Sequence, residues 1–139
     1  MVILEGSAAV GKTSVINSLK EYNLVDRDKY ICKLFDFNIS LLDRVSKLKE
    51  YLASSKDYVI FLINNDCEEL ERRISLRVVI DEFDRYTYLY NLLYLEAYLY
   101  MEKNDMLNKR LFMVDCTDLG LDEVINKVKW IIDENIMIN

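Results

Sequence analysis

The sequence predicts an α/β fold, a three-layer sandwich in which helices cover both faces of a mostly parallel sheet. Two observations predict it. Short apolar runs alternate with segments of helical periodicity, as is typical of parallel strands joined by covering helices. A glycine-containing loop separates the first apolar run from the first helical segment. Because the chain contains no proline, internal repeat or low-complexity linker, we expect residues 1–139 to form a single domain.

Four apolar segments are expected to form the strands. Residues 2–4 are a short run suited to a buried parallel strand, and residues 24–26 predict a short edge strand. Residues 58–63 are an unbroken run rich in β-branched and aromatic residues, which predicts a central strand. Residues 111–114 predict the last strand. Ligands bind at the carboxyl ends of such strands, and acidic side chains stand at three of these ends.

The helices follow from the spacing of apolar residues. That spacing predicts helices over residues 12–22, 39–53 and 121–132. Residues 67–101 contain neither glycine nor proline and are expected to be helical almost throughout, with a break or bend near residues 81–84.

A phosphate-binding motif is the most specific feature of the chain. Residues 5–14, EGSAAVGKTS, match the pattern G-x-x-x-x-G-K-[ST] in full, between a predicted strand and a predicted helix. At a helix N-terminus, N–H groups without a helical partner and the positive end of the dipole attract phosphate oxygens. The sequence therefore predicts a nucleoside triphosphate site formed by Gly6, Ser7, Ala8, Ala9, Val10, Gly11, Lys12, Thr13 and Ser14.

The motif also assigns chemistry to individual groups. The backbone N–H groups of residues 7–13 are expected to surround the β-phosphate, and Lys12 to bridge the β- and γ-phosphates as a catalytic residue. The Thr13 hydroxyl is expected to ligate magnesium. ATP and Mg²⁺ are therefore the expected cofactors.

Composition excludes several other functions. The chain has no histidine, and its three cysteines are isolated, which rules out a Ser-His-Asp triad and argues against a zinc site. Free thiols fit a reducing compartment, so we expect a cytoplasmic protein. The net charge of −6, without a basic stretch, argues against a nucleic-acid partner. No apolar run reaches the length of a membrane span, so no membrane partner is expected.

Several segments together carry a family resemblance. Glu-Gly opens the phosphate loop, an E-R-R-x-x-x-R segment follows the central strand, and an acidic pair precedes a helix rich in tyrosine and leucine. In this combination the chain resembles the P-loop deoxynucleoside kinases and thymidylate kinases over residues 1–22 and 58–133. The resemblance implies a P-loop NTPase fold of the nucleotide kinase type, with a LID region around residues 68–86. It also implies that the loop after the last strand passes beside the adenine.

The LID of these kinases donates guanidinium groups to the transferring phosphoryl group. The resemblance gives this catalytic role to Arg72 and Arg77, with Arg73 in the same stretch and Arg85 as a further candidate. At position 77 the planar fork of a guanidinium also suits phosphate oxygens. The alternative is a solvated helix face on which the arginines pair with Glu68, Glu69 and Glu71.

The middle of the chain, residues 23–57, is shorter than in the family. It contains one candidate for the family's D-R motif, Asp26-Arg27. The resemblance implies that Asp26 binds a magnesium-bound water or accepts the proton of the substrate hydroxyl, and that Arg27 binds a substrate phosphate. The alternative is a charged turn. A rival metal ligand is Asp81, which ends the run 78–80 in the manner of a Walker B strand, with Glu82 as the base.

The tyrosine-rich segment 86–100 is expected to belong to the core or to a subunit interface rather than to a nucleobase site. A helix that is apolar on nearly all sides should be buried on more than one side. We therefore expect a homodimer formed through helical surfaces.

The expected function is ATP-dependent phosphoryl transfer to a small nucleoside or nucleotide acceptor. A deoxynucleoside monophosphate, as in thymidylate kinases, is favoured because Arg27 suits an acceptor phosphate. The alternatives are a deoxynucleoside kinase and a non-catalytic module that senses or sequesters nucleotides. A GTPase is disfavoured because the N-K-x-D and D-x-x-G elements are absent.

Overall fold

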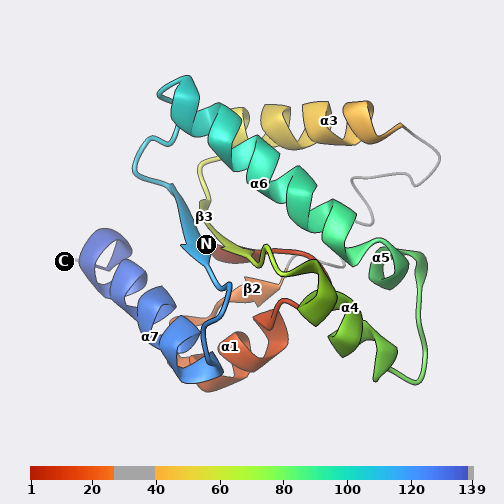
Figure 1. The fold of residues 1–139 in the computed structure, drawn as a ribbon. Coiled ribbons are helices and arrows are strands. Elements are labelled where there is room, and N and C mark those ends of the chain that lie inside the picture. Colours follow the sequence, from red (N-terminus) through yellow and green to blue (C-terminus); the bar gives the residue numbers. More distant parts are fainter. Residues whose placement is uncertain (27–39, 138–139) are drawn as a thin grey trace.

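The computed structural model describes residues 1–26 and 40–137. These residues form an α/β fold in which helices cover both faces of a four-stranded, all-parallel sheet (Figure 1). The sheet has the order β2-β1-β3-β4, and its strands are β1 (Val2–Glu5), β2 (Val25–Asp26), β3 (Tyr58–Ile63) and β4 (Leu111–Asp115). The predicted α/β class, the parallel sheet and all four strands are confirmed.

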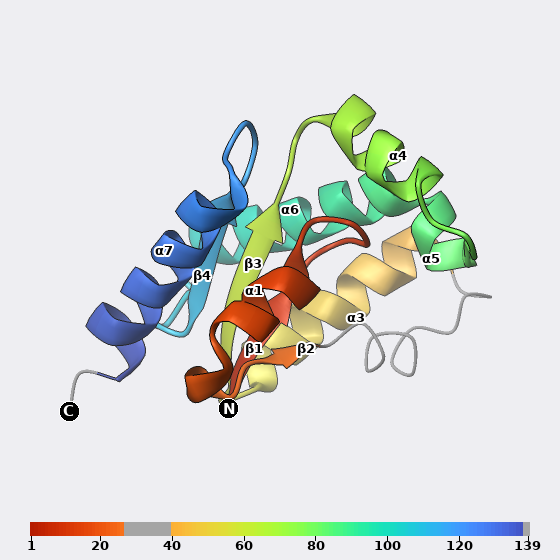
Figure 2. The same ribbon diagram turned by 90° about the horizontal axis from the view of Figure 1, so that it is seen from below.

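Parallel pairing of the two central strands, β1 and β3, brings the carboxyl end of β1 beside β3. Leu4 pairs with Ile60 on one side and with Asp26 on the other, and Ile60 pairs in turn with Phe112. Figure 2 shows β1, β3 and β4 running towards the same end of the molecule. The segments that follow these three strands therefore meet at one edge of the sheet.

The upper face of the sheet in Figure 1 is covered by α3 (Leu41–Ser54) and α6 (Thr87–Lys103). Phe61 contacts two tyrosines of α6 here, with ring centroids 6.2 Å from Tyr94 and 5.9 Å from Tyr98. Alternate strand residues face this layer because side chains alternate across a strand. They are Ile3, Val59, Phe61, Ile63 and Leu111.

The opposite face is covered by α1 (Lys12–Ser18) and α7 (Leu121–Ile131), which contact each other. The strand residues of the other parity point into this second core. They are Leu4, Ile60, Leu62 and Val114. The unbroken apolar sequence of β3 thus serves two cores, since this strand is buried on both faces.

Helix ends differ in detail from the prediction. The first helix ends at Ser18 and continues as a 3₁₀ turn at Lys20–Tyr22, and α7 is followed by a π-helical turn at Ile132–Ile136. Ser40 caps α3, because its hydroxyl accepts a hydrogen bond from the N–H of Asp43 at 3.2 Å.

The break in the segment 67–101 is longer than expected. The segment contains α4 (Cys67–Ser75), α5 (Glu82–Arg85) and most of α6. Residues 76–81, between α4 and α5, form neither helix nor strand. The expectation that the helix continues to a break near residues 81–84 is wrong, because α4 ends at its C-cap Leu76. A Walker B strand at 78–80 is not formed either, since the Val78 side chain is fully exposed and cannot belong to a buried strand.

The tyrosine-rich helix α6 is mainly a core helix, as expected. Tyr90, Tyr94 and Tyr98 are buried, whereas Leu99 and Tyr100 are exposed on the other side of the helix. Within the described residues, no helix has both the length and the hydropathy needed to span a bilayer.

We predict that Gly6→Ala destabilises the fold by about 1–3 kcal/mol, the usual cost of forcing atoms into a packed core. A Cβ at Gly6 would lie 2.8 Å from the carbonyl oxygen of Leu62 and 2.9 Å from Cγ1 of Val10. Urea unfolding followed by circular dichroism measures the change. Gly120→Ala is the matched control, since its Cβ would meet only a glutamate oxygen at 3.6 Å. Equal loss of stability in the two variants would contradict the steric argument.

Candidate nucleotide-binding site

A cavity of about 400 Å³ lies at the carboxyl end of the sheet. Three segments form it: the loop after β1 with the start of α1, the α4 region, and the segment from β4 to α7. Its lining consists of Ser7, residues 9–15, Arg73, Arg77, Cys116, Leu119, Leu121 and Val124. The predicted phosphate loop thus shares one cavity with two of the candidate arginines and with the segment after the last strand.

Two glycines give the loop its path. Gly6 lies directly against β3, where no Cβ fits. Gly11 has a φ of 110°, a left-handed conformation that glycine adopts without strain, and α1 begins at the next residue. Because Gly11 provides no capping side chain, the first turn of α1 has no side-chain acceptor of its own. Such a turn suits a phosphate.

The Lys12 side chain is buried on the inner side of the loop, with 4% of its surface exposed. Its ammonium donates hydrogen bonds to the carbonyl oxygens of Gly6 and of Ser7, the latter at 3.1 Å. These bonds tie the start of α1 back to the end of β1. They also place a positive charge in the lining of the cavity.

Two helices hold the tip of the loop from outside. The Arg73 guanidinium donates to the carbonyl oxygen of Ala9 at 3.0 Å, and the Thr87 hydroxyl of α6 donates to the carbonyl oxygen of Ala8. A carbonyl oxygen that pointed at a phosphate would repel it. The bonds from Arg73 and Thr87 give both carbonyls a donor within the protein. Nothing in the sequence signals the contact of Thr87, which looks like an ordinary first helix residue.

Arg72 and Arg73 share one carboxylate but lie in different surroundings. Glu69 accepts from Arg72 Nε at 2.9 Å and Nη2 at 2.7 Å, and from Arg73 Nε at 2.9 Å. The hydrogen bonds from Arg72, and then those from Arg73, lower the pKa of Glu69 to about 2. Arg72 is exposed and does not line the cavity, whereas Arg73 does. The ion pairing expected as the alternative role is therefore present in part, with Glu69 as the partner of both arginines. For Arg73 it coexists with a place in the lining of the cavity.

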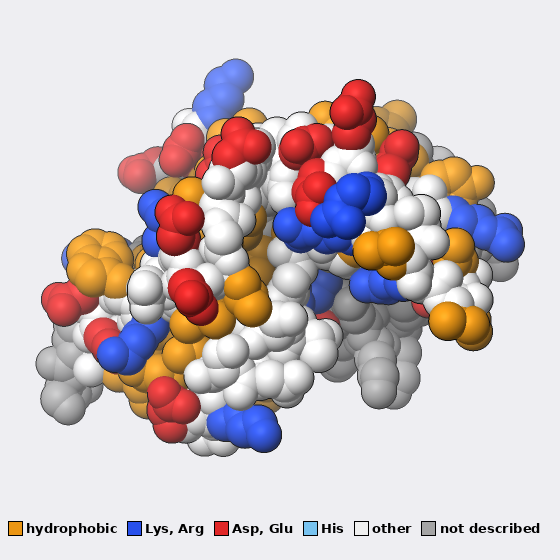
Figure 3. All heavy atoms as spheres, turned by 60° about the horizontal axis from the view of Figure 1, so that its bottom comes forward, with side chains coloured by type: hydrophobic (Ala, Val, Ile, Leu, Met, Phe, Trp, Pro, Cys, Tyr) orange, Lys and Arg blue, Asp and Glu red, His pale blue; other side chains and the backbone are white. Residues whose placement is uncertain are grey.

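Arg77 also lines the cavity, and it forms an ion pair with the buried Asp84. Asp84 is fixed in turn by Asp81: the N–H of Asp84 donates to the Asp81 carboxylate at 2.8 Å, and the N–H of Asp81 donates to the Asp84 carboxylate at 3.1 Å. This reciprocal pair caps the short helix α5. Arg77 is therefore held beside the loop although it lies beyond the end of α4. Figure 3 shows the basic side chains of this region gathered beside a hollow in the surface.

Two of the predicted carboxylates, Asp26 and Asp81, do not line the cavity. Asp26 is exposed at the end of β2 and Asp81 belongs to the α5 cap. Arg27 lies outside the described residues. Thr13, the proposed magnesium ligand, lines the cavity. The described part of the chain contains no cluster of three or more acidic, cysteine or histidine side chains that could hold a metal ion by itself.

A buried polar chain that sequence reasoning missed positions α4. The N–H of Asn64 donates to Oδ1 of Asn91 at 2.8 Å, and Oδ1 of Asn64 accepts from the N–H of Asp66 at 2.9 Å. Asp66 then caps α4 by accepting from the N–H of Glu69 at 3.1 Å. The asparagine in the apolar centre of the helix α6 was the signal for this network, since a fully buried amide needs partners.

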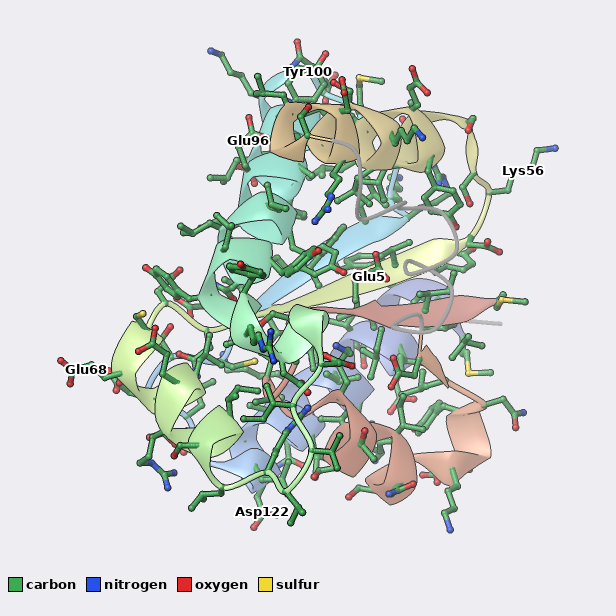
Figure 4. All side chains as sticks on the ribbon, turned by 90° about the vertical axis from the view of Figure 1, so that its right-hand side faces the viewer. Glu5, Lys56, Glu68, Glu96, Tyr100 and Asp122 are labelled. Atoms are coloured by element: carbon green, nitrogen blue, oxygen red, sulfur yellow. The ribbon has the colours of Figure 1, made fainter. Side chains whose placement is uncertain are left out.

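The part of the cavity beyond the loop is apolar. Cys116, Leu119, Leu121 and Val124 line it, and burial raises the pKa of the Cys116 thiol to about 11, so the thiol stays protonated at neutral pH. Glu5, the last residue of β1, is not part of this lining: it is 1% exposed and lies within the sheet (Figure 4). The cavity therefore has a cationic, hydrogen-bonding half and an apolar half, as an amphiphilic phosphate ester requires.

No protein-family model matches the chain, and no curated protein matches it. What the site can do therefore has to be argued from its residues and their geometry.

We predict that Glu69 contributes to the acid sensitivity of the fold. Its pKa in the folded state is about 2, below the ordinary value of 4.5. The stability from ionised Glu69 is therefore fully present above about pH 4.5 and is lost as the pH falls towards 2. In Glu69→Gln this part of the loss should disappear, measured by unfolding between pH 2 and pH 7. Glu68→Gln is the control, because Glu68 points outward from α4 (Figure 4). A Glu69 carboxyl that titrates near 4.5 by NMR would refute the prediction.

Proposed function

We propose that the chain is a P-loop nucleotide kinase that transfers the γ-phosphoryl group of ATP, with Mg²⁺, to a deoxynucleoside monophosphate. The observation that carries the proposal is the single cavity in which the loop of residues 7–14, Lys12, Arg73 and Arg77 meet. Phosphoryl transfer depends mainly on positioning and on positive charge around the transferred group. Lys12 of α1, Arg73 of α4 and Arg77 of the following segment would supply that positive charge.

Each group has a role in this proposal. The N–H groups of the loop and of the first turn of α1 bind the β-phosphate, and Lys12 moves from its carbonyl partners to bridge the β- and γ-phosphates. Arg77 faces the γ-phosphate, and Arg73 keeps the loop in shape through Ala9 while adding charge. The apolar lining at Leu119 and Val124 holds the base.

The site also fits a magnesium ion. Mg²⁺ keeps most of its ligands as waters and phosphate oxygens and needs only one or two protein oxygens. The hydroxyl of Thr13, in the lining of the cavity, is the protein ligand in this proposal. The bound ion would neutralise charge on the β- and γ-phosphates. Asp26, at the end of the neighbouring strand β2, is proposed to act through a water of the ion or as the proton acceptor.

The acceptor is proposed from the resemblance to thymidylate kinases and from the Asp26-Arg27 pair. In this proposal Arg27 binds the phosphate of the acceptor, and a guanidinium suits that role because it offers two parallel donors.

We predict that ATP turnover requires a deoxynucleoside monophosphate and that Lys12→Ala abolishes it. Loss of a charge-assisted hydrogen bond of about 1.5–3 kcal/mol should also weaken ATP binding by about tenfold or more. Coupled-assay kinetics over a panel of deoxynucleosides and their monophosphates, together with calorimetric titration with ATP, measure both effects. Lys20→Ala, on the exposed 3₁₀ turn, is the matched control.

Two results would overturn the proposal. One is turnover at the same rate with no acceptor, which would indicate an NTPase. The other is ATP binding without turnover on any acceptor of the panel, which would indicate a binding module. Turnover restricted to deoxynucleosides would keep the kinase and change its acceptor.

The adjacent arginines allow a matched comparison. We predict that Arg73→Ala weakens ATP binding and slows turnover by about tenfold, since it removes both a charge of the cavity and the anchor of Ala9. Arg72→Ala should change both by less than about twofold, because a surface ion pair contributes little. Each variant removes one partner of Glu69, so the loss of ion pairing is shared. Equal effects in the two variants would contradict the assignment.

A further inference from the structure

The outer edge of β4 lies at one side of the sheet. This strand is the last of the sheet, and within the described residues no further strand pairs with its outer side. Its sequence from Leu111 to Val114 is apolar and contains no lysine, proline or bulge that would discourage pairing. An edge of this kind is a template for another strand, and proteins normally block it or cover it.

The hydrogen bonds of β4 show which backbone groups face outward. The carbonyl of Arg110 accepts from Val59 at 2.8 Å, and the N–H of Cys116 donates to Ile63 at 2.6 Å, so even-numbered residues bond to β3. The N–H and C=O groups of odd-numbered residues therefore point away from the sheet. Of these, the N–H of Leu111 donates to Leu107 at 3.1 Å. The backbone N–H and C=O groups of Met113, at the centre of the strand, point away from the sheet.

Charges at the two ends of β4 are complementary to each other. Lys109 is exposed just before the strand, whereas Asp115 and Asp118 are exposed at its end and just after it. A second β4 that runs antiparallel brings the basic end of one copy to the acidic end of the other, twice. A second β4 that runs parallel brings like charges together. The charge pattern thus fits the edge to an antiparallel copy of itself.

A groove continues this edge onto α7. It has a volume of about 490 Å³, and Met113, Val114, Lys127, Trp130 and Ile131 are among its lining residues. The Trp130 side chain is 63% exposed, although a large aromatic residue is usually buried at least in part. Figure 3 shows apolar side chains on this α7 side of the surface. A second copy of β4, paired with this one, would bring its own α7 to this groove.

We propose that two copies of the chain associate along β4, antiparallel about a two-fold axis at Met113, so that their sheets become one. In this register Met113 faces Met113 of the second copy as a hydrogen-bonded pair. The N–H of Asp115 reaches the carbonyl of the second copy's Leu111. The pairing forms about four backbone hydrogen bonds, and the two α7 helices lie side by side over the joined sheet. The interface lies outside the cavity, so this assembly does not depend on the proposed kinase activity.

The helical surface expected from the sequence is the competing interface. The outer side of α6 does expose Leu99 and Tyr100. However, Lys49 of α3 already forms an ion pair with Glu96 at 3.3 Å there, and its ammonium lies 4.1 Å from the ring centroid of Tyr100. Figure 4 shows Glu96 and Tyr100 on this outer side. Part of that surface is therefore engaged in polar contacts within one copy, although Leu92 and Leu99 stay exposed on it. The edge of β4, in contrast, offers backbone N–H and C=O groups to a partner.

The test uses Trp130, the single tryptophan of the chain, as its probe. Sedimentation velocity of the intact protein between about 1 and 100 µM should show a dimer that dissociates on dilution, and tryptophan emission should shift to the red as it does so. Met113→Lys should give a monomer at every concentration, with red-shifted emission, because two lysines would meet on the axis. Leu99→Lys, on the competing α6 surface, should leave the dimer unchanged. Circular dichroism checks the fold of both variants.

A second variant keeps the proposal testable if Met113→Lys does not fold. Met113→Cys preserves the apolar edge, and the Cα atoms of a hydrogen-bonded pair lie about 5.5 Å apart, within disulfide range. Mild oxidation should convert it to a covalent dimer, at least tenfold faster than Leu99→Cys. The unsubstituted chain, oxidised in parallel, reports any dimer formed through its own cysteines.

Three results would overturn the proposal. They are a monomer at about 100 µM, a dimer that Leu99→Lys dissociates and Met113→Lys does not, and equal rates of oxidation for the two cysteine variants. The second of these would assign the interface to α6 instead.

Discussion

The close approach of the chain to β3 at Gly6 is the constraint on which the candidate site depends. Parallel pairing brings the end of β1 beside β3, and the backbone at Gly6 then lies so near to Leu62 that no side chain fits. The loop must therefore turn away from the sheet at Gly6, and it ends at Gly11, after which α1 begins. The N-terminus of α1 is thereby fixed relative to the ends of β3 and β4. Every other part of the cavity is placed by one of these two strands.

The basic side of the cavity is positioned by a relay of polar groups that starts from two buried asparagines. Asn64 follows the end of β3, is bonded to Asn91 of α6 and accepts from the N–H of Asp66, which caps the start of α4. This helix in turn carries Arg73 to the loop tip. The relay thereby ties the start of α4 to the end of β3 and to α6. The sheet thus determines where the arginines lie, although they are far from the loop in sequence.

The long strands, the capped helix and the phosphate loop could be predicted from the sequence. The strands at residues 58–63 and 111–115 and the capped helix α3 have clear local signals, and the phosphate-loop pattern defines its own backbone path. The break at residues 76–81 could not be predicted, because it contains no glycine or proline and its apolar residues imitate a strand. The different positions of Arg72 and Arg73 could not be predicted either. Neighbouring residues on a helix point about 100° apart, and only the docking of α4 decides which of them faces the loop.

The resting position of Lys12 has a consequence for selectivity. Its ammonium is held by carbonyl oxygens of its own loop, which act as an internal substitute for a ligand. An incoming molecule that draws the ammonium away has to offer it a stronger interaction than these carbonyls do. An ionised phosphate group, whose negative charge is shared over its oxygens, meets that condition, whereas the hydroxyls of a free nucleoside do not. For the proposed nucleotide site, this position of Lys12 would favour anionic ligands over uncharged molecules of the same shape.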